Sequence, residues 1–447
     1  MTLGTDRTLA PRLIKYGGAA LSPENVPKAL EDARQGTGPL VLVVSARAGV
    51  TDLLQGCLKP PFRMVGHVET LEQLRRLHPN LPPEGEVELH GLASDLKELR
   101  KVGRATKALS DRLLARGERL AAHWFAGELR RQGVEAVALQ ADEIGLCTDG
   151  PKGEGRILLE RSARPVRTRI VRELRRGRVP VVTGFLARSS SGTVTTLGRG
   201  GSDYSATAIG YCIGASRVEL VKDPFELLTA DPRWVPGARP ILSISFDEAE
   251  ELAQFGAKVL HPRTIEPARK GAFEIIVRSL SDPGRQTRVS PVPGAQPVRA
   301  LALLSPIALL ILRVPGGRQR RGVISEASEL LVGAGVNVVA LFTSSAQLCI
   351  AVEGPQAARS VRALRRFVEE EGATLEGPHS AALVTAIGQG ILGDLGEFPP
   401  EAGSLVLGAS ATARALSLAV PERRAPDVLR ELHLRLVEQP SVPGGAA

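Results

Sequence analysis

The sequence has 447 residues, of which 43% are apolar and 23% charged, so it can bury sizeable cores and is not a disordered chain. Its four cysteines are scattered singly, with no C-x-x-C pair, which argues against a disulfide framework or a structural metal and favours a reducing, cytoplasmic setting. The net charge is +9, but aromatic residues make up only 3%, so the stacking surfaces of single-strand binders are scarce and no nucleic acid partner is expected.

From about residue 13 to residue 280, short apolar runs alternate with helical patterns, which is typical of a mostly parallel sheet covered by helices. The sequence predicts strands at 13–15, 39–45, 134–139, 179–183, 218–221 and 273–277. It predicts helices at 110–132, 202–214 and 245–256. Between residues 60 and 110 the pattern is polar and helical but broken by prolines, which indicates a helical insertion with loops.

The segment 281–297 is rich in proline, glycine and serine and is predicted to be an interdomain linker. Beyond it, a pattern of strand, helix, strand, strand and helix occurs twice. The first copy has strands at 307–314, 337–343 and 347–352 and helices at 325–333 and 357–371; the second has strands at 383–387, 404–407 and 416–420 and a helix at 427–437. We therefore expect domains at 1–290, 298–376 and 377–447. The longest apolar run, 301–314, is too short to span a bilayer, so no membrane association is expected.

A glycine-rich turn at 195–207, TTLGRGGSDYSAT, opens directly into a predicted helix. Its glycines permit close approach of a ligand, the helix start offers free N–H donors, and Arg199 adds a forked cation, so the turn suits an anion. The alternative is a plain turn in which Ser202 or Asp203 only caps the helix.

A second loop, Lys15-Tyr16-Gly17-Gly18, follows the first predicted strand, and open α/β sheets bind ligands at such strand ends. No Walker A pattern occurs, which disfavours a P-loop enzyme. The string 388–393 matches G-x-G-x-x-G, but Pro399 and Pro400 break the helix that a dinucleotide site needs.

In chain order, KYGG, VVSARAGVTD, GERLAAH, VTGF, TTLGRGGSDYSAT, LTADPR and FGAKVLHPRTIEPA resemble the motifs of aspartate kinases, members of the amino acid kinase family, over residues 12–290. The tail resembles their paired ACT domains. This resemblance implies a mostly parallel α/β sheet sandwiched by helices, followed by tandem α+β ACT-like regulatory domains. Because the chain stops after the tail, a monofunctional enzyme without a fused dehydrogenase is expected.

The resemblance further implies transfer of the ATP γ-phosphate to the β-carboxylate of L-aspartate, the first step of lysine, threonine and methionine biosynthesis. Mg²⁺ would be held mainly by phosphate oxygens and water, so no protein metal site is expected. Lys15 would neutralise charge on the transferring group, and Asp203 would hold the lysines in place. The expected aspartate-binding residues are Ser45, Ala46, Thr51, Glu118, Arg199 and Ser202, with Arg199 on the α-carboxylate and Glu118 on the α-ammonium. The expected ATP-binding residues are Gly17, Gly18, Asp223, Arg233 and Lys258.

Several positions depart from the family pattern. Ala19 and Ala20 replace a threonine and a serine, Lys222 replaces the usual threonine before Asp223, and Leu228 replaces a tyrosine near the adenine. A catalytically weakened or silent amino-acid-sensing paralogue therefore stays open as an alternative.

The resemblance also implies an amino acid effector at the ACT-like repeats and a homodimer or larger homo-oligomer. In relatives inhibited by lysine, carboxylates in the strand-turn-strand region pair with the effector's ammonium, but 335–352 contains none. The identity of the effector is left open.

Overall fold

The computed structural model of the protein describes residues 11–35, 38–60, 62, 64–150, 155–223, 227–256, 260–282, 284–291, 300–314, 320–343, 347–389, 391 and 406–438. The chain forms two compact units. The first comprises Met1–Leu227, Leu242–Phe246 and Val259–Pro293, and the second Leu228–Ile241, Asp247–Lys258 and Gly294–Ala447.

The first unit is built on an eight-stranded sheet with the order β3-β4-β2-β1-β7-β9-β10-β8. Its strands are β1 (Arg12–Tyr16), β2 (Leu40–Val44), β3 (Ala136–Leu139), β4 (Val179–Thr183), β7 (Arg217–Val221), β8 (Ser243–Ser245), β9 (Glu274–Arg278) and β10 (Gln286–Ser290). All neighbours are parallel except β9 and β10. The six strands predicted from apolar runs are confirmed.

The prediction that 281–297 is a linker was wrong for residues 286–290, which form β10. In the run Gln286–Ser290, Thr287 and Val289 are fully buried between β8 and β9. The period-2 alternation of this short strand was masked by the prolines and glycines on either side.

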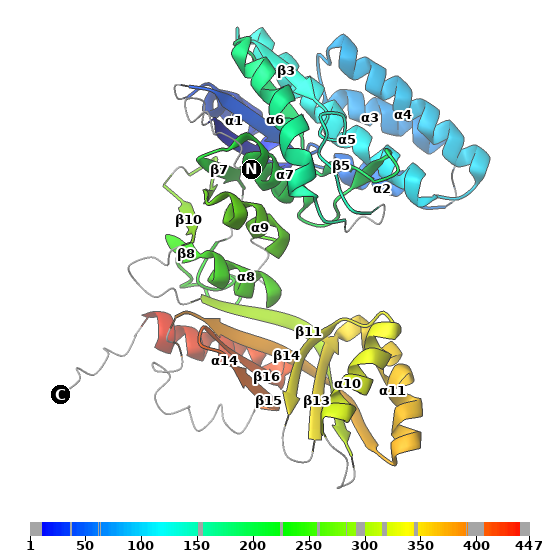
Figure 1. Ribbon diagram of the computed structural model, residues 1–447, viewed down its shortest axis with the longest axis vertical. Coiled ribbons are helices and arrows are strands. Elements are labelled where there is room, and N and C mark those ends of the chain that lie inside the picture. Colours follow the sequence, from blue (N-terminus) through cyan, green and yellow to red (C-terminus); the bar gives the residue numbers. More distant parts are fainter. Residues whose placement is uncertain are drawn as a thin grey trace, which may run out of the picture. The chain divides into compact units, whose positions relative to one another are not determined.

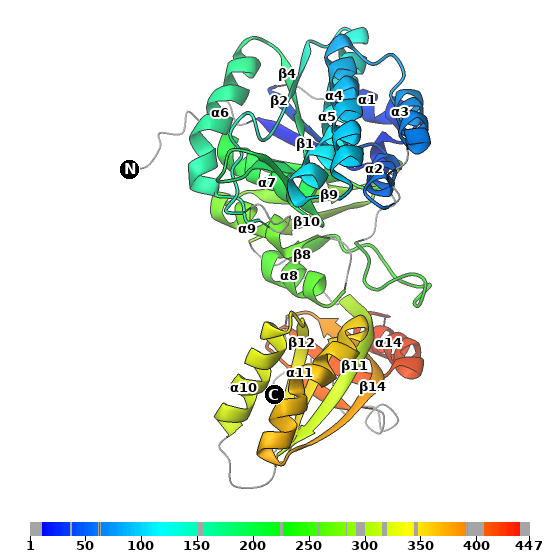
Figure 2. The ribbon, with the colours of Figure 1, turned by 90° about the vertical axis from the view of Figure 1, so that its right-hand side faces the viewer.

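Helices cover both faces of the sheet (Figures 1 and 2). They are α1 (Val26–Arg34), α2 (Val50–Cys57), α3 (Met64–Leu77), α4 (Pro83–Val102), α5 (Lys107–Arg131), α6 (Leu159–Arg175), α7 (Gly201–Ile213) and α9 (Pro262–Gly271). Helices α1 and α5 pack on the side chains of Ile14 and Tyr16 in one core. Helix α7 contacts β1, and α3 and α4 form a leucine-rich core with α5. The insertion predicted between 60 and 110 contains α3 and α4.

The second unit contains a six-stranded antiparallel sheet with the order β12-β13-β11-β14-β16-β15. Its elements are β11 (Ala300–Arg313), α10 (Arg320–Gly333), β12 (Val338–Thr343), β13 (Gln347–Glu353), α11 (Ala357–Glu371), β14 (Thr374–Ile387), β15 (Gly408–Ala411), β16 (Ala415–Pro421) and α14 (Ala425–His433). Helices α10 and α11 pack on β11 and β13, and α14 packs on β14 and β16.

β11 and β14 pair along almost their whole length. Each of these two strands therefore belongs to the sheets of both copies of the sequence repeat. The strand expected at 404–407 lies instead at Gly408–Ala411, and residues 401–405 are outside the described part. The expected fold class, a helix-sandwiched parallel sheet followed by tandem ACT-like α+β repeats, is confirmed.

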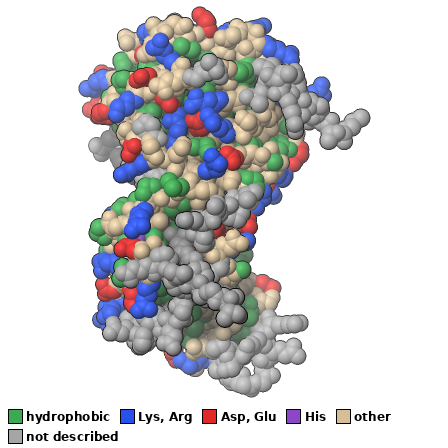
Figure 3. All heavy atoms as spheres, turned by 90° about the vertical axis from the view of Figure 1, so that its left-hand side faces the viewer, with side chains coloured by type: hydrophobic (Ala, Val, Ile, Leu, Met, Phe, Trp, Pro, Cys, Tyr) green, Lys and Arg blue, Asp and Glu red, His purple; other side chains and the backbone are tan. Residues whose placement is uncertain are grey.

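Within the described residues, the four cysteines are free thiols, and no helix is both long and apolar enough to cross a membrane. Charged side chains of both signs are interspersed on the face drawn in Figure 3. On the surface of the second unit, Arg313 pairs with Glu376 at 3.0 Å.

Candidate active site

The carboxyl ends of β1 and β7 bring two lysines to one aspartate. These strands are parallel neighbours in which Tyr16 lies opposite Val221. Lys15, just before Tyr16, and Lys222, just after Val221, therefore lie at the same end of the sheet. The Nζ atom of Lys15 lies 2.6 Å from Oδ1 of Asp203, and the Nζ atom of Lys222 lies 2.9 Å from Oδ2. Asp203 stands in the first turn of α7, where the helix dipole also favours a negative charge.

This cluster is almost closed to solvent, since Lys15 and Asp203 are each 6% exposed. Burial by itself raises the pKa of Asp203, but the two ammonium groups outweigh burial and hold the pKa well below its usual range. Asp203 is therefore ionised at any physiological pH and cannot act as a general base. With two cations on one carboxylate, the cluster has a net charge of +1.

The Lys15-Tyr16-Gly17-Gly18 loop packs tightly against the loop after β2. The Gly17 N–H donates to the carbonyl oxygen of Val221 at 3.3 Å, and the Ala48 N–H donates to the carbonyl oxygen of Gly18 at 3.2 Å. A Cβ atom on Gly18 would lie only 2.8 Å from the carbonyl oxygen of Ala46. Glycine is required there because backbone meets backbone.

Glu118 reaches the same loop from α5. Its Oε1 accepts a hydrogen bond from the Ala46 N–H at 3.4 Å. Burial raises the pKa of Glu118 to about 8, although the hydrogen bond from Ala46 and the charge of Lys15 both favour the ionised form. This buried acid changes protonation near neutral pH and would accept a cationic group from a ligand.

The glycine-rich turn is fixed by its threonines. The hydroxyl groups of Thr195 and Thr196 donate to the buried carboxylate of Asp111 on α5 at 3.1 and 2.7 Å. Gly200 has φ +71°, and a Cβ atom there would lie 2.7 Å from the Cβ atom of His261. Arg199 is exposed at the tip of the turn and makes no hydrogen bond or ion pair within the described part of the chain.

The hairpin of β5 (Leu186–Arg188) and β6 (Val194–Thr196), which leads into this turn, was not predicted. Its signal, the run of serines and glycine at 189–192 between two short apolar runs, was available in the sequence.

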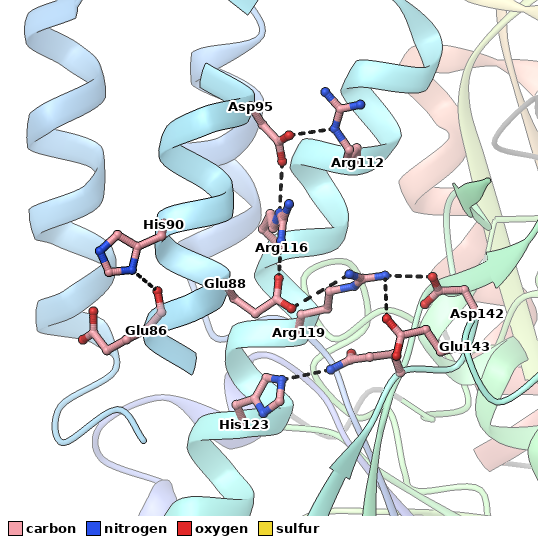
Figure 4. A network of polar contacts seen from close by, with 11 residues as sticks. Glu86, Glu88, His90, Asp95, Arg112, Arg116, Arg119, His123, Asp142 and Glu143 are labelled. Carbon is pink, nitrogen blue, oxygen red and sulfur yellow. Dashed lines mark hydrogen bonds and ion pairs between the residues drawn. The ribbon is translucent and has the colours of Figure 1, made fainter. Parts of the chain in front are cut away.

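An ion-pair network connects α5 to α4 and to the segment that follows β3 (Figure 4). Arg116 contacts Asp95 at 3.0 Å and Glu88 at 2.5 Å, both on α4. Arg119 contacts Asp142, which follows β3, at 2.8 Å. Because Glu118 lies between these two arginines in the sequence, the network fixes the helix that carries it.

The structure therefore brings together Lys15, Gly17, Gly18, Ala46, Glu118 and Asp203. The Ser45 N–H donates to the carbonyl oxygen of Tyr16 at 3.1 Å. Thr51 is half-buried in α2, and Ser202 is half-buried beside Asp203 in α7.

The other residues predicted to contact the nucleotide, beyond Gly17 and Gly18, do not form one cluster in the structure. Asp223 accepts hydrogen bonds from the hydroxyl groups of Ser279 and Ser281, each at 2.8 Å. Arg233 belongs to the second unit, where its Nε lies 2.9 Å from an oxygen of Asp231. Lys258 lies outside the described residues.

Lys222 was not predicted as a site residue. Its position next to a buried strand end was visible in the sequence, but the adjacency of β7 to β1 was not. Within the described residues, no group of three His, Cys, Asp or Glu side chains could hold a metal ion.

Both the sequence and the fold of this chain match those of known proteins. Residues 11–279 match the amino acid kinase family. The chain is 37% identical to chloroplastic aspartokinase 3 of Arabidopsis thaliana over 256 residues, which cover 54% of this chain and 46% of that protein. It spans about half the length of three such plant relatives. It is 30% identical to the aspartokinase of Geobacillus stearothermophilus over 345 residues, covering 73% of this chain and 82% of that protein.

The solved structure of Escherichia coli aspartokinase III in complex with aspartate and ADP, in the R-state, matches with a TM-score of 0.78 and 26% identity, covering 95% of this chain and 99% of that one. The same enzyme in complex with lysine and aspartate, in the T-state, matches with a TM-score of 0.73 and 27% identity, covering 96% of this chain and 100% of that one.

Proposed function

The chain belongs to the amino acid kinase family and, within it, to the aspartokinases, and we propose that it transfers the γ-phosphoryl group of ATP to the β-carboxylate of L-aspartate. The products are 4-phospho-L-aspartate and ADP. The observation that carries the proposal is the buried Lys15–Asp203–Lys222 cluster of net charge +1 beside the tightly packed glycine loop. Such a cluster attracts a polyphosphate.

The chemistry needs no general base. The β-carboxylate of aspartate is ionised at neutral pH, so one of its oxygens attacks the γ-phosphorus directly. As that bond forms, the bond from the γ-phosphorus to the bridging oxygen breaks, and its electron pair stays on the β-phosphate of ADP. No proton moves, so catalysis consists of alignment and charge compensation.

Each residue of the site has a role that fits this reaction. Lys15 stabilises charge on the transferring group, and Asp203 keeps the ammonium group of Lys15 in place. Glu118 receives the α-ammonium group of aspartate, and Arg199 at the open tip of the turn binds its α-carboxylate. The other predicted contacts are Ser45, Ala46, Thr51 and Ser202 for aspartate, and Gly17, Gly18, Asp223, Arg233 and Lys258 for ATP.

Mg²⁺ enters as part of the MgATP substrate in this proposal. Both oxygens of Asp203 already contact ammonium groups, so the phosphate oxygens and water would supply the ligands of the ion. When bound, the ion neutralises charge on the phosphates.

We further propose that residues 1–290 form the catalytic domain and that the ACT-like repeats at 298–376 and 377–447 bind an amino acid effector in a homodimer. The second unit contains the sheet and helices of both repeats. The E. coli relative has been solved with lysine, but the absence of carboxylates in 335–352 leaves the effector of this chain to be identified.

The test incubates the purified full chain with MgATP, aspartate and hydroxylamine, and measures the hydroxamate. We expect product from aspartate but not from glutamate, and a loss of activity in Lys15→Ala. If folded protein gives no product at high substrate, the active-enzyme proposal fails. Calorimetry then tests the alternative, an amino-acid sensor, which would bind an amino acid but not ATP.

A further inference from the structure

We infer that Lys222 is a second catalytic cation, whose ammonium group contacts the transferring phosphoryl group alongside Lys15. This inference rests on the proposed phosphotransferase function. It also reverses the expectation from sequence, in which a lysine at this position counted only as a departure from the family pattern.

The first argument is placement. Lys222 directly follows β7, and Lys15 lies two residues earlier in register on the adjacent strand β1, opposite Leu220. Their Nζ atoms contact different oxygens of the same carboxylate, Oδ1 and Oδ2 of Asp203. The two ammonium groups therefore lie at one end of the sheet, where open α/β folds bind their ligands.

The second argument is charge. A lysine and an aspartate form a neutral pair, and a neutral pair offers little net attraction to a phosphate. The second ammonium raises the cluster to a net charge of +1 at a site where burial weakens screening by solvent. Lys222 therefore adds a second positive charge beside Asp203.

The third argument is access. The side chain of Lys222 is 21% exposed, whereas that of Lys15 is 7% exposed. Lys222 is thus the ammonium that an arriving anion meets first. The neighbouring cation Arg278 is held by two carboxylates, Asp32 at 2.7 Å and Glu219 at 2.8 Å.

The fourth argument is the composition of the glycine loop. Ala19 and Ala20 have no hydroxyl group that could donate to a phosphate oxygen. A cation from the neighbouring strand replaces those donors, and a charged donor to a phosphate oxygen is stronger than a hydroxyl.

The experiment compares the wild-type chain with Lys222→Thr, Lys222→Arg and the matched control Lys28→Thr, which removes an exposed lysine on α1. We expect Lys222→Thr to lower kcat for aspartate about tenfold to hundredfold, with the KM for aspartate changed less than about twofold. Lys222→Arg keeps the charge and should recover most of the rate, and the control should match the wild type. Loss of kcat below about twofold in Lys222→Thr, or equal losses in the Thr and Arg variants, would overturn the inference.

A binding measurement separates this inference from the proposed function. Calorimetry with a non-hydrolysable ATP analogue and with ADP needs no turnover. We expect Lys222→Thr to weaken binding of the analogue at least about fivefold and binding of ADP less than about twofold, because only the former carries a γ-phosphate. Equal effects on the two nucleotides would refute a γ-phosphate contact even if aspartate proves not to be the substrate.

Discussion

Replacing Glu118 by glutamine should make the first unit more stable at high pH and change its stability little at low pH. The ordinary pKa of a glutamate is 4.5, and burial raises that of Glu118 to about 8. The folded state therefore holds a proton that the unfolded state releases between these two values. The stability of the wild type falls as the pH rises through this window, whereas a glutamine at the same place does not titrate.

The size of the effect follows from the interval between 4.5 and about 8, which corresponds to a maximal cost of roughly 5 kcal/mol at about 1.4 kcal/mol per pH unit. At pH 5 the cost is below about 1 kcal/mol, and by pH 9 it is close to its maximum. The advantage of Glu118→Gln over the wild type should therefore grow by about 4 kcal/mol between pH 5 and pH 9.

Urea denaturation followed by tryptophan fluorescence measures this difference. Trp124 is 2% exposed on α5, in the same helix as Glu118, and Trp234 is 38% exposed in the second unit. In a Trp234→Phe background the signal reports the first unit alone. Glu69→Gln, at an exposed position on α3, is the matched control and should show the same pH dependence as the parent.

The reasoning is refuted if the gap between Glu118→Gln and the parent is the same at pH 5 and pH 9. Binding offers an independent check on the same group. Because the α-ammonium group of aspartate favours the ionised form of Glu118, aspartate binding at pH 7 should release about one proton, which calorimetry in buffers of different ionisation enthalpy detects. Glu118→Gln should release none.

Three further substitutions test the surroundings of the site. Gly18→Ala should abolish nearly all activity and lower the melting temperature, because the new Cβ would lie 2.8 Å from the carbonyl oxygen of Ala46; an active, equally stable variant would contradict this packing. Asp203→Asn should destabilise the fold by roughly 3 kcal/mol, since it removes the buried carboxylate that both ammonium groups contact, and a denaturation curve like that of the wild type would argue against the cluster. Arg119→Met should destabilise the first unit by about 3 kcal/mol through the orphaned carboxylate of Asp142, an effect that the second substitution Asp142→Asn should partly relieve; the absence of such relief would show that the two side chains are not coupled.

The parts of the fold that follow from local patterns were predicted well. The six buried strands of the first unit were visible as short apolar runs, and the start of α7 as glycines followed by Ser202 and Asp203. The strand β10 was missed, because the prolines and glycines on both sides predicted a linker and the alternation of the strand extends over only five residues. The local pattern also failed to predict α6, a helix rich in arginine that contains Pro165.

The site was predicted in part, for a different reason. Lys15 and Asp203 are recognisable from their motifs, but the contact of Lys222 with Asp203 depends on strand order, which no local pattern encodes. The pKa of Glu118 likewise depends on the burial that α5 and the loop after β2 create together. Such properties arise from tertiary packing and cannot be read from the residues around each position.

The unbroken strands of the second unit limit how this protein can change over evolution. β11 and β14 are each 14 residues long, or about 45 Å when extended, and each serves both repeats. Deleting one repeat would therefore cut through the sheet of the other. A recombination point that spares this unit has to keep β11 and β14 together, and with them the segments Leu228–Ile241 and Asp247–Lys258, which belong to the same unit.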